Sequence, residues 1–114
     1  MYLLIIILHK DEWLEDVLSC LIEIGIEDAI ILEGESLEKV LAKKVPLFAG
    51  IKFNLKGKDY SKIILAISDF KGVGREITEI LKPIGLNFEE EGTGRILTLK
   101  LDSIIGIPKE IIEV

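Results

Sequence analysis

The sequence predicts an α+β fold in which two β-α-β units form a four-stranded antiparallel sheet with both helices on one face. Two short apolar runs rich in β-branched residues, Tyr2–Leu8 and residues 62–68, are typical of central strands covered on both faces. Each run precedes a stretch in which apolar residues recur with helical spacing. The chain has 114 residues, of which 49% are hydrophobic, so we expect one compact domain spanning residues 1–114.

The first β-α-β unit runs from the strand Tyr2–Leu8 to a second strand at residues 29–32. We expect the intervening helix at residues 11–24, because acidic side chains crowd its first turns and Gly25 supplies a stop. Cys20 is interpreted as a small packed residue, since no basic neighbour lowers the pKa of its thiol. The apolar face of this helix consists of Leu14, Val17, Leu18, Leu21 and Ile22.

A less regular segment, residues 35–60, separates the two units. Ser36 is predicted to cap a short helix with Leu37, Val40 and Leu41 on one face, and Pro46 either ends this helix or follows it. Residues 51–55 alternate apolar and polar side chains, which is typical of an exposed strand arm, before Gly57 turns the chain. We therefore interpret residues 35–60 as an arm or loop outside the core.

The second unit begins with the strand at residues 62–68, after which Asp69 is predicted to cap a helix that ends at Pro83 and Gly85. A fourth strand is expected at residues 95–101, followed by an apolar tail at residues 102–114. The apolar face of the helix consists of Val73, Ile77, Ile80, Leu81 and Ile84, and that of the strand consists of Leu97, Leu99 and Leu101.

Right-handed crossovers between these strands give the ferredoxin-like βαββαβ sandwich, whose helices cover only one face of the sheet. The strands Tyr2–Leu8 and 62–68 nevertheless look buried on both faces. We therefore expect identical subunits to pack sheet to sheet over the other face.

The charge distribution marks the middle of the chain as a distinct surface feature. The net charge of −6 argues against nucleic acid as a partner, because a phosphate backbone repels a negative molecule. Residues 1–38 contain ten acidic side chains and one basic side chain, whereas residues 39–62 contain seven lysines and only one acidic residue. A nucleic-acid role for these lysines and the nearby aromatics is less favoured than packing of the apolar residues on a neighbouring subunit.

Several other classes of protein are also disfavoured. One cysteine cannot form an internal disulfide, and the apolar start lacks the basic flank and cleavage site of a signal peptide, so we expect a cytoplasmic location. No apolar run approaches the roughly 20 residues that a membrane-spanning helix needs. His9 is the only histidine, so the sequence offers neither a histidine metal pair nor an evident serine–histidine catalytic pair, and we expect no enzymatic activity.

Five sequence segments resemble the nitrogen-regulatory P-II signalling proteins and their P-II-like relatives. The resemblance covers most of the chain outside residues 35–60. The segments are Leu14-Glu15-Asp16-Val17, Glu23-Ile24-Gly25-Ile26, Lys62-Ile63-Ile64, Gly92-Thr93-Gly94-Arg95-Ile96, and Asp102-Ser103-Ile104-Ile105-Gly106-Ile107.

The resemblance implies a homotrimer, packed sheet to sheet, that takes part in nitrogen regulation and signal transduction. It implies a small metabolite at the clefts between subunits, either an adenine nucleotide (ATP, ADP or AMP) or another anion. From the composition, we expect that no cofactor is required for folding. The nucleotide- or anion-binding loop would be Gly92, Thr93, Gly94 and Arg95. Its glycines would let backbone N–H groups approach the oxygens of the anion, and the guanidinium of Arg95 would donate charge-assisted hydrogen bonds to them. Two arginines that reach the phosphates in the family are replaced by Gly106 and Pro108.

The resemblance also implies a partner, a membrane transporter or a metabolic enzyme, which would be contacted through residues 35–60. The partner-loop residues would then be Lys39, Lys43, Lys44, Lys52, Lys56 and Lys58. The alternative function is a metal-handling or structural trimer like the divalent-cation-tolerance proteins, which share this fold.

Simpler interpretations of the same segments remain open. Residues 92–95 also fit a turn into an edge strand. Residues 72–75, Gly-Val-Gly-Arg, fit a helix start with two glycines better than a phosphate cradle, because the third glycine of the dinucleotide fingerprint is missing. Three successive glutamates, 89–91, fit a solvated loop better than a site for a hard cation.

Overall fold

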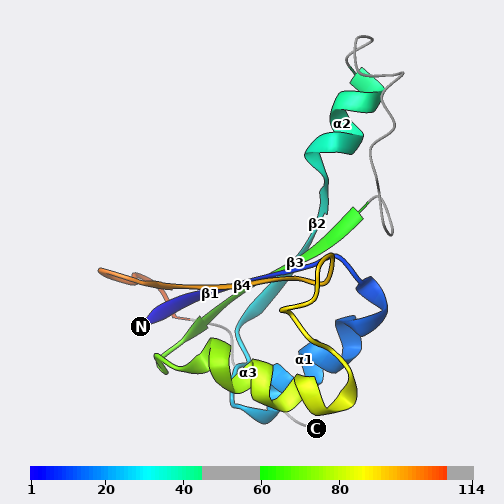
Figure 1. The fold of residues 1–114 in the computed structure, drawn as a ribbon. Helices are drawn as coiled ribbons and strands as arrows, with labels where there is room; N and C mark the ends of the chain where they lie inside the picture. The colour runs from blue at the N-terminus through cyan, green and yellow to red at the C-terminus, as the bar shows by residue number, and fades with distance from the viewer. Residues whose placement is uncertain (45–59, 108–114) are drawn as a thin grey trace, which may run out of the picture.

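Two β-α-β units and a projecting arm are visible in Figure 1, drawn from a computed structural model that describes residues 1–44 and 60–107, without the side chains of 42–44. The elements in chain order are β1 (Tyr2–Leu8), the 3-10 turn η1 (Asp11–Trp13), α1 (Leu14–Glu23), β2 (Ala29–Glu35), α2 (Leu37–Lys44), β3 (Tyr60–Ser68), α3 (Val73–Leu81), the 3-10 turn η3 (Lys82–Ile84) and β4 (Gly94–Lys100).

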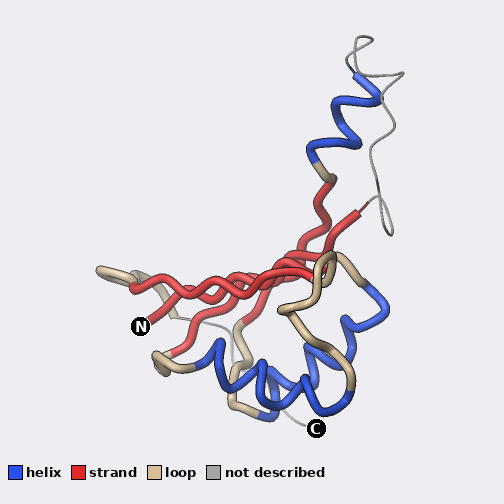
Figure 2. Tube along the Cα trace, viewed as in Figure 1, coloured by secondary structure: helices blue, strands red, loops and turns tan. Residues whose placement is uncertain are grey.

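The strands form one antiparallel sheet in the order β2-β3-β1-β4, so β1 and β3 are central. Ile5 of β1 lies opposite Leu65 of β3 on one side and Leu97 of β4 on the other. Helices α1 and α3 pack side by side on one face of the sheet (Figures 1 and 2). The predicted ferredoxin-like α+β class is confirmed.

The core lies between the sheet and these two helices. Leu4, Ile6 and Leu8 of β1 are fully buried, because alternate residues of a strand point to one face and these three point toward the helices. Helix α3 approaches β4 so closely that a Cβ on Gly74 would lie 3.2 Å from Cγ2 of Ile96. Close packing thus explains one of the glycines at residues 72–75, where the prediction of a helix start is confirmed.

Both predicted helices differ from the structure at their ends. The first begins as the 3-10 turn η1, and Ile22 is 66% exposed because it lies about 100° around α1 from the buried Leu21. Ile84 is 53% exposed because it belongs to η3, where the chain has already left α3.

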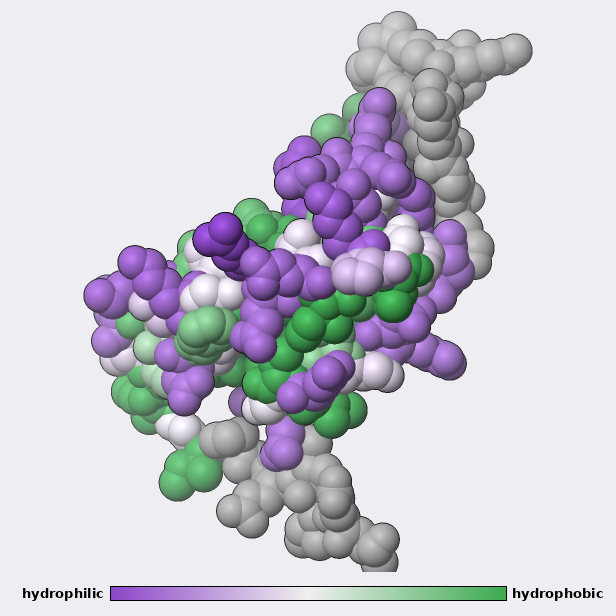
Figure 3. Space-filling model, turned by 60° about the horizontal axis from the view of Figure 1, so that its bottom comes forward, coloured by the Kyte–Doolittle hydropathy of each residue, from purple (hydrophilic) through white to green (hydrophobic). Residues whose placement is uncertain are grey.

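Figure 3 shows hydrophobic patches at the surface between hydrophilic side chains, with the helix-bearing side turned forward.

The prediction that Asp69 caps the helix of the second unit is wrong. The residue before α3 is Gly72, which makes no side-chain cap hydrogen bond. Instead, Oγ of Ser68 accepts a hydrogen bond of 3.0 Å from the backbone N–H of Phe70. The chain therefore makes a turn directly after β3, and α3 starts only at Val73.

The arm is a continuation of β2 and β3 beyond the body of the molecule. The two strands stay paired as far as Glu35 and Tyr60, and α2 then lies well away from the sheet (Figure 1). The predicted cap is confirmed, because Oγ of Ser36 accepts a hydrogen bond of 3.3 Å from the N–H of Lys39. The predicted stop at Pro46 and the strand at residues 51–55 lie outside the described residues. No helix in the described ranges is long and apolar enough to cross a membrane.

The second face of the sheet carries aliphatic side chains that no described helix covers. We call this surface the open face, and among its residues Ile30 is 60% exposed and Leu99 is 48% exposed. Within this single chain, β1 and β3 are therefore covered on the helix side only. By strand alternation and register, the apolar residues of the open face are Leu3, Ile5, Ile7, Ile30, Leu32, Ile63, Leu65, Ile67, Leu97 and Leu99.

Candidate functional site

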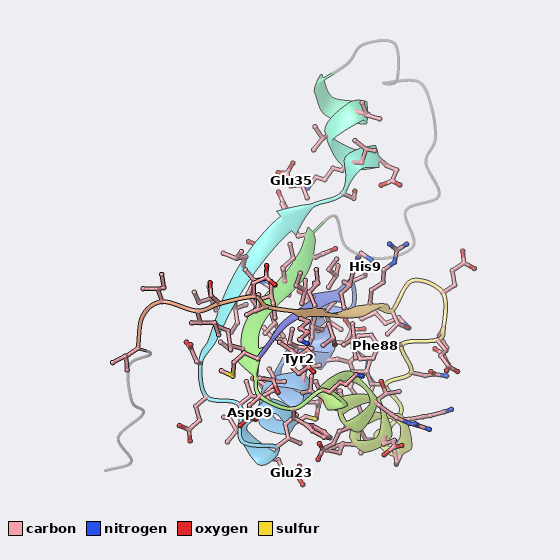
Figure 4. The ribbon with its side chains drawn as sticks, turned by 90° about the vertical axis from the view of Figure 1, so that its left-hand side faces the viewer. Tyr2, His9, Glu23, Glu35, Asp69 and Phe88 are labelled. Atoms are coloured by element: carbon pink, nitrogen blue, oxygen red, sulfur yellow. The ribbon has the colours of Figure 1, made fainter. Side chains whose placement is uncertain are left out.

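The segment predicted to bind an anion lies at the end of the sheet from which the arm projects. Gly94 begins β4 opposite Leu8, and Arg95 lies opposite Ile7. The backbone N–H of His9, the residue after β1, donates a hydrogen bond of 3.0 Å to the carbonyl oxygen of Thr93. Figure 4 shows His9 near the foot of the arm and Glu35 at the upper end of β2. The structure thus places the predicted loop beside the arm.

Both glycines of this loop are required by the backbone itself. Gly92 has a φ of +82°, a left-handed conformation that other residues adopt at a cost. Gly94 has a φ of +147°, and a Cβ there would clash with the carbonyl oxygen of Ile7. The tight turn and the close approach of β4 to β1 therefore explain the glycines, and binding of an anion by their N–H groups stays a prediction.

Thr93, between the two glycines, is 1% exposed and points into the protein. Its hydroxyl oxygen has no hydrogen-bond partner among the described residues. Burial of a hydroxyl without a partner costs desolvation energy, and in this conformation the Thr93 side chain is not displayed to a ligand at the surface. Of the four predicted loop residues, Arg95 is the one with an exposed charged side chain.

The structure adds a polar pair that sequence reasoning did not find. Nδ1 of His9 and Oγ of Ser61 lie 2.6 Å apart, although 52 residues separate them in the chain. The register of β1 and β3 explains this contact, because Ile7 lies opposite Ile63 and the next outward pair on the same face is His9 and Ser61. Neither residue belongs to a sequence motif, so the pair could have been found only by predicting this register.

The pair His9–Ser61 and the guanidinium of Arg95 border the same end of the open face. Arg95 lies opposite Ile7, which in turn lies opposite Ile63, two residues from Ser61. Within the described part of the chain, no ion pair engages Arg95. A free guanidinium beside a hydroxyl and an imidazole can bind a carboxylate or phosphate group through charge-assisted hydrogen bonds.

The serine–histidine pair does not by itself make a hydrolytic site. In a catalytic triad a third group orients the imidazole, and preorganised donors stabilise the oxyanion. Among the described residues, Ser61 is the side-chain partner of the His9 ring, and no carboxylate orients it. The arrangement is better suited to binding than to nucleophilic catalysis.

At the neck of the arm, Lys39 of α2 is 6% exposed, and its Nζ lies 3.6 Å from the centre of the Tyr60 ring. This cation–π contact joins the first turns of α2 to the start of β3. Across the same two strands, Nζ of Lys62 lies 3.2 Å from Oε1 of Glu33. Lys39 therefore links α2 to β3 at the base of the arm.

Two of the remaining partner-loop lysines belong to α2. Lys43 and Lys44 lie in the last turn of α2, and Lys52, Lys56 and Lys58 lie outside the described residues. Their contact with a partner stays a prediction.

The other candidates give no additional site. Cys20 is 3% exposed, and burial, with smaller contributions from Glu23 and Glu76, raises the pKa of its thiol to about 11, as expected of a packed residue. The acidic loop at residues 89–91 is solvated, and Glu90 lies 3.8 Å from Nζ of Lys10. In the described ranges, no group of three or more histidine, cysteine or acidic residues could hold a metal ion.

Comparison with known proteins gives a clear answer for the fold alone. No family model matches the sequence, and no curated protein matches it significantly. Among solved structures, the chain is similar to the crystal structure of Arabidopsis thaliana PII bound to citrate, with a TM-score of 0.57 and 20% identity. The match covers 93% of this chain and 81% of the PII chain. The chain therefore has a P-II-like fold.

Proposed function

We propose that this protein is a P-II-like regulatory protein without catalytic activity, which binds a small anion at the foot of the arm and controls a partner through the arm. The observation that carries the proposal is the position of Arg95, His9 and Ser61 at the end of the sheet where the arm begins. A ligand there would lie at the base of the arm, which projects from the body of the molecule, so its binding can alter the arm.

The open face supports a trimer as the functional form. Complete burial of one large aliphatic side chain contributes about 1.5–3 kcal/mol, and ten such side chains share this face. In the family that the sequence resembles, three subunits pack sheet to sheet. In such an assembly Arg95, at the edge of the open face, would lie at the boundary between two subunits, where the family binds its ligands.

The proposed ligand is an anion, with an adenine nucleotide and a polycarboxylate as the two candidates. The nucleotide follows from the resemblance, although Gly106 and Pro108 replace two cations, each of which would contribute on the order of 1.5–3 kcal/mol through a charge-assisted hydrogen bond. The polycarboxylate follows from the similar PII structure, which holds citrate. Arg95 and His9 can serve either ligand, because both present anionic oxygens.

The proposed partner is a membrane transporter or a metabolic enzyme that the arm contacts in the cytoplasm, in keeping with a role in nitrogen regulation. The arm presents α2 away from the sheet, and Lys39 and Tyr60 hold its base. The protein would neither insert into a membrane nor bind nucleic acid. The alternative of a divalent-cation-tolerance-like trimer gains no specific observation from the described residues.

Calorimetric titration of the full chain with ATP, ADP, AMP and citrate tests the proposal. We expect saturable heat with at least one of them, and at least about tenfold weaker binding in Arg95→Gln, because one charge-assisted bond is lost. The matched control is Arg75→Gln, since Arg75 is an exposed arginine on α3 whose Nε lies 3.5 Å from Glu79. Absence of heat with all four ligands, or equal weakening in the two variants, would overturn the anion site.

A further inference from the structure

The pair His9–Ser61 is anchored at the foot of the arm and is open to solvent. Nδ1 of His9 and Oγ of Ser61 lie 2.6 Å apart, and the backbone N–H of His9 donates a hydrogen bond of 3.0 Å to the carbonyl oxygen of Thr93. The residue opposite Ser61 on β2 is Gly34, so that strand places no side chain opposite the pair. His9 is exposed, and protons and small ions from solution therefore reach its ring.

The number of polar hydrogens that the pair can offer to an anion depends on the charge of the imidazole. A neutral imidazole carries one N–H and Ser61 carries one O–H, and in either tautomer one of these two hydrogens is used between the ring and the hydroxyl. An imidazolium carries two N–H groups. Because its Nδ1–H must donate to Oγ of Ser61, the other N–H and the serine O–H are both free to donate. Protonation of His9 thus adds one donor and one positive charge at the same place.

Arg95 is, in the described ranges, the charged side chain that shares this face of the sheet with His9 at the arm end. An imidazolium there would repel the guanidinium of Arg95, and an anion held between the two cations offsets that repulsion. The proton and the anion therefore favour each other's binding, by the same factor in each direction. The other titratable side chains near His9 point to the opposite face of the sheet or follow His9 in the chain; they are Glu33, Glu35, Tyr60, Lys62, Lys10 and Asp11.

We infer that the site at the foot of the arm takes up a proton together with its anion, with His9 as the group that receives the proton. The inference rests on the anion site of the proposed function and goes beyond it, because it makes the site respond to pH as well as to its ligand. Histidine is the side chain that changes charge between about pH 5 and 8, and this chain has one histidine. An arginine side chain stays charged over that whole range, so the change in affinity is assigned to His9.

Calorimetric titration of the full chain with sulfate at pH 6 and pH 8, at constant ionic strength, tests the inference. Sulfate remains a dianion at both pH values, so titration of the ligand contributes nothing. We expect at least about fivefold tighter binding at pH 6, because one added charge-assisted hydrogen bond corresponds to about tenfold or more when the ring is fully protonated. His9→Gln, which keeps a neutral hydrogen-bonding side chain, should bind sulfate with the same affinity at both pH values. The matched control is Lys10→Gln, which removes the neighbouring cation and should retain the pH dependence.

Nuclear magnetic resonance of the single histidine supplies a second readout, because the nitrogen resonances of its ring report whether the imidazole is neutral or protonated. At pH 7, saturating sulfate should move these resonances toward the imidazolium values, and the same concentration should move them much less in Arg95→Gln.

Equal affinities at the two pH values, a pH dependence that persists in His9→Gln, or ring resonances that sulfate leaves unmoved would overturn the uptake of a proton and leave the anion site of the proposed function intact. Absence of sulfate binding at both pH values also overturns it. If ATP, ADP, AMP and citrate fail to bind as well, the proposed function is overturned with it.

Discussion

The substitution Leu97→Asp tests whether the open face is a contact between subunits. Leu97 lies in the middle of β4, opposite Ile5, and is 39% exposed in the single chain. Sealing the face would bury that exposed part, which is about two fifths of the 1.5–3 kcal/mol of a whole leucine side chain. An aspartate there would lose this contribution and add a desolvation penalty of several kcal/mol for its carboxylate.

Together these effects should destabilise each subunit contact by more than about 3 kcal/mol, which corresponds to more than about a hundredfold in association. The monomer should remain folded, because its core lies on the other side of the sheet. Light scattering after size-exclusion chromatography measures the mass directly. We expect a trimer for the wild type and for the control Thr98→Asp, whose side chain points to the opposite face, and a monomer for Leu97→Asp. A trimer of undiminished stability in Leu97→Asp would refute the reasoning.

Two further predictions concern the loop and the core. Gly94→Ala should lower the free energy of unfolding by roughly 2–4 kcal/mol, because the added Cβ would meet the carbonyl oxygen of Ile7. Gly92→Ala should lower it by only about 1 kcal/mol, because the space around Gly92 is open and only its positive φ opposes a side chain. Urea denaturation measures both losses, and equal losses would contradict the close approach of β4 to β1. Cys20 should react very slowly with a thiol reagent at pH 8, since its pKa is about 11 and the reactive form is the thiolate. Rapid labelling of the folded protein at pH 8 would show that the thiol is not buried. Because burial raises this pKa from 9.0, the contribution of the thiol to the free energy of unfolding should be present below pH 9 and be lost as the pH rises toward 11.

Features that depend on neighbouring residues in the chain could be predicted from the sequence. The unbroken apolar run Tyr2–Leu8 indicated a central strand, and Ser36 indicated a helix start, because strand pattern and capping are local properties. The ends of the helices were less predictable. Ile22 fits the spacing of a buried face but lies about 100° around α1 from the buried Leu21, and tertiary packing decides which of the two faces the core.

The candidate site depends on contacts between distant segments, which explains why only part of it was found. Arg95 was predicted because residues 92–96 resemble a family loop, but His9 and Ser61 carry no motif and meet only through the register of β1 and β3. Lys39 was predicted as one of six partner-loop lysines, and its contact with the Tyr60 ring was not predicted. Burial of a long cationic side chain against an aromatic ring leaves no pattern in a single sequence.

The central claim is that an anion bound beside Arg95 changes the arm. Hydrogen exchange of the full chain, with and without the anion that gives heat in calorimetry, measures this most directly. The account predicts increased protection of the backbone amides at residues 33–40, where β2 passes into α2, and no such increase in Arg95→Gln. Saturating ligand that leaves exchange in the arm unchanged would contradict the account.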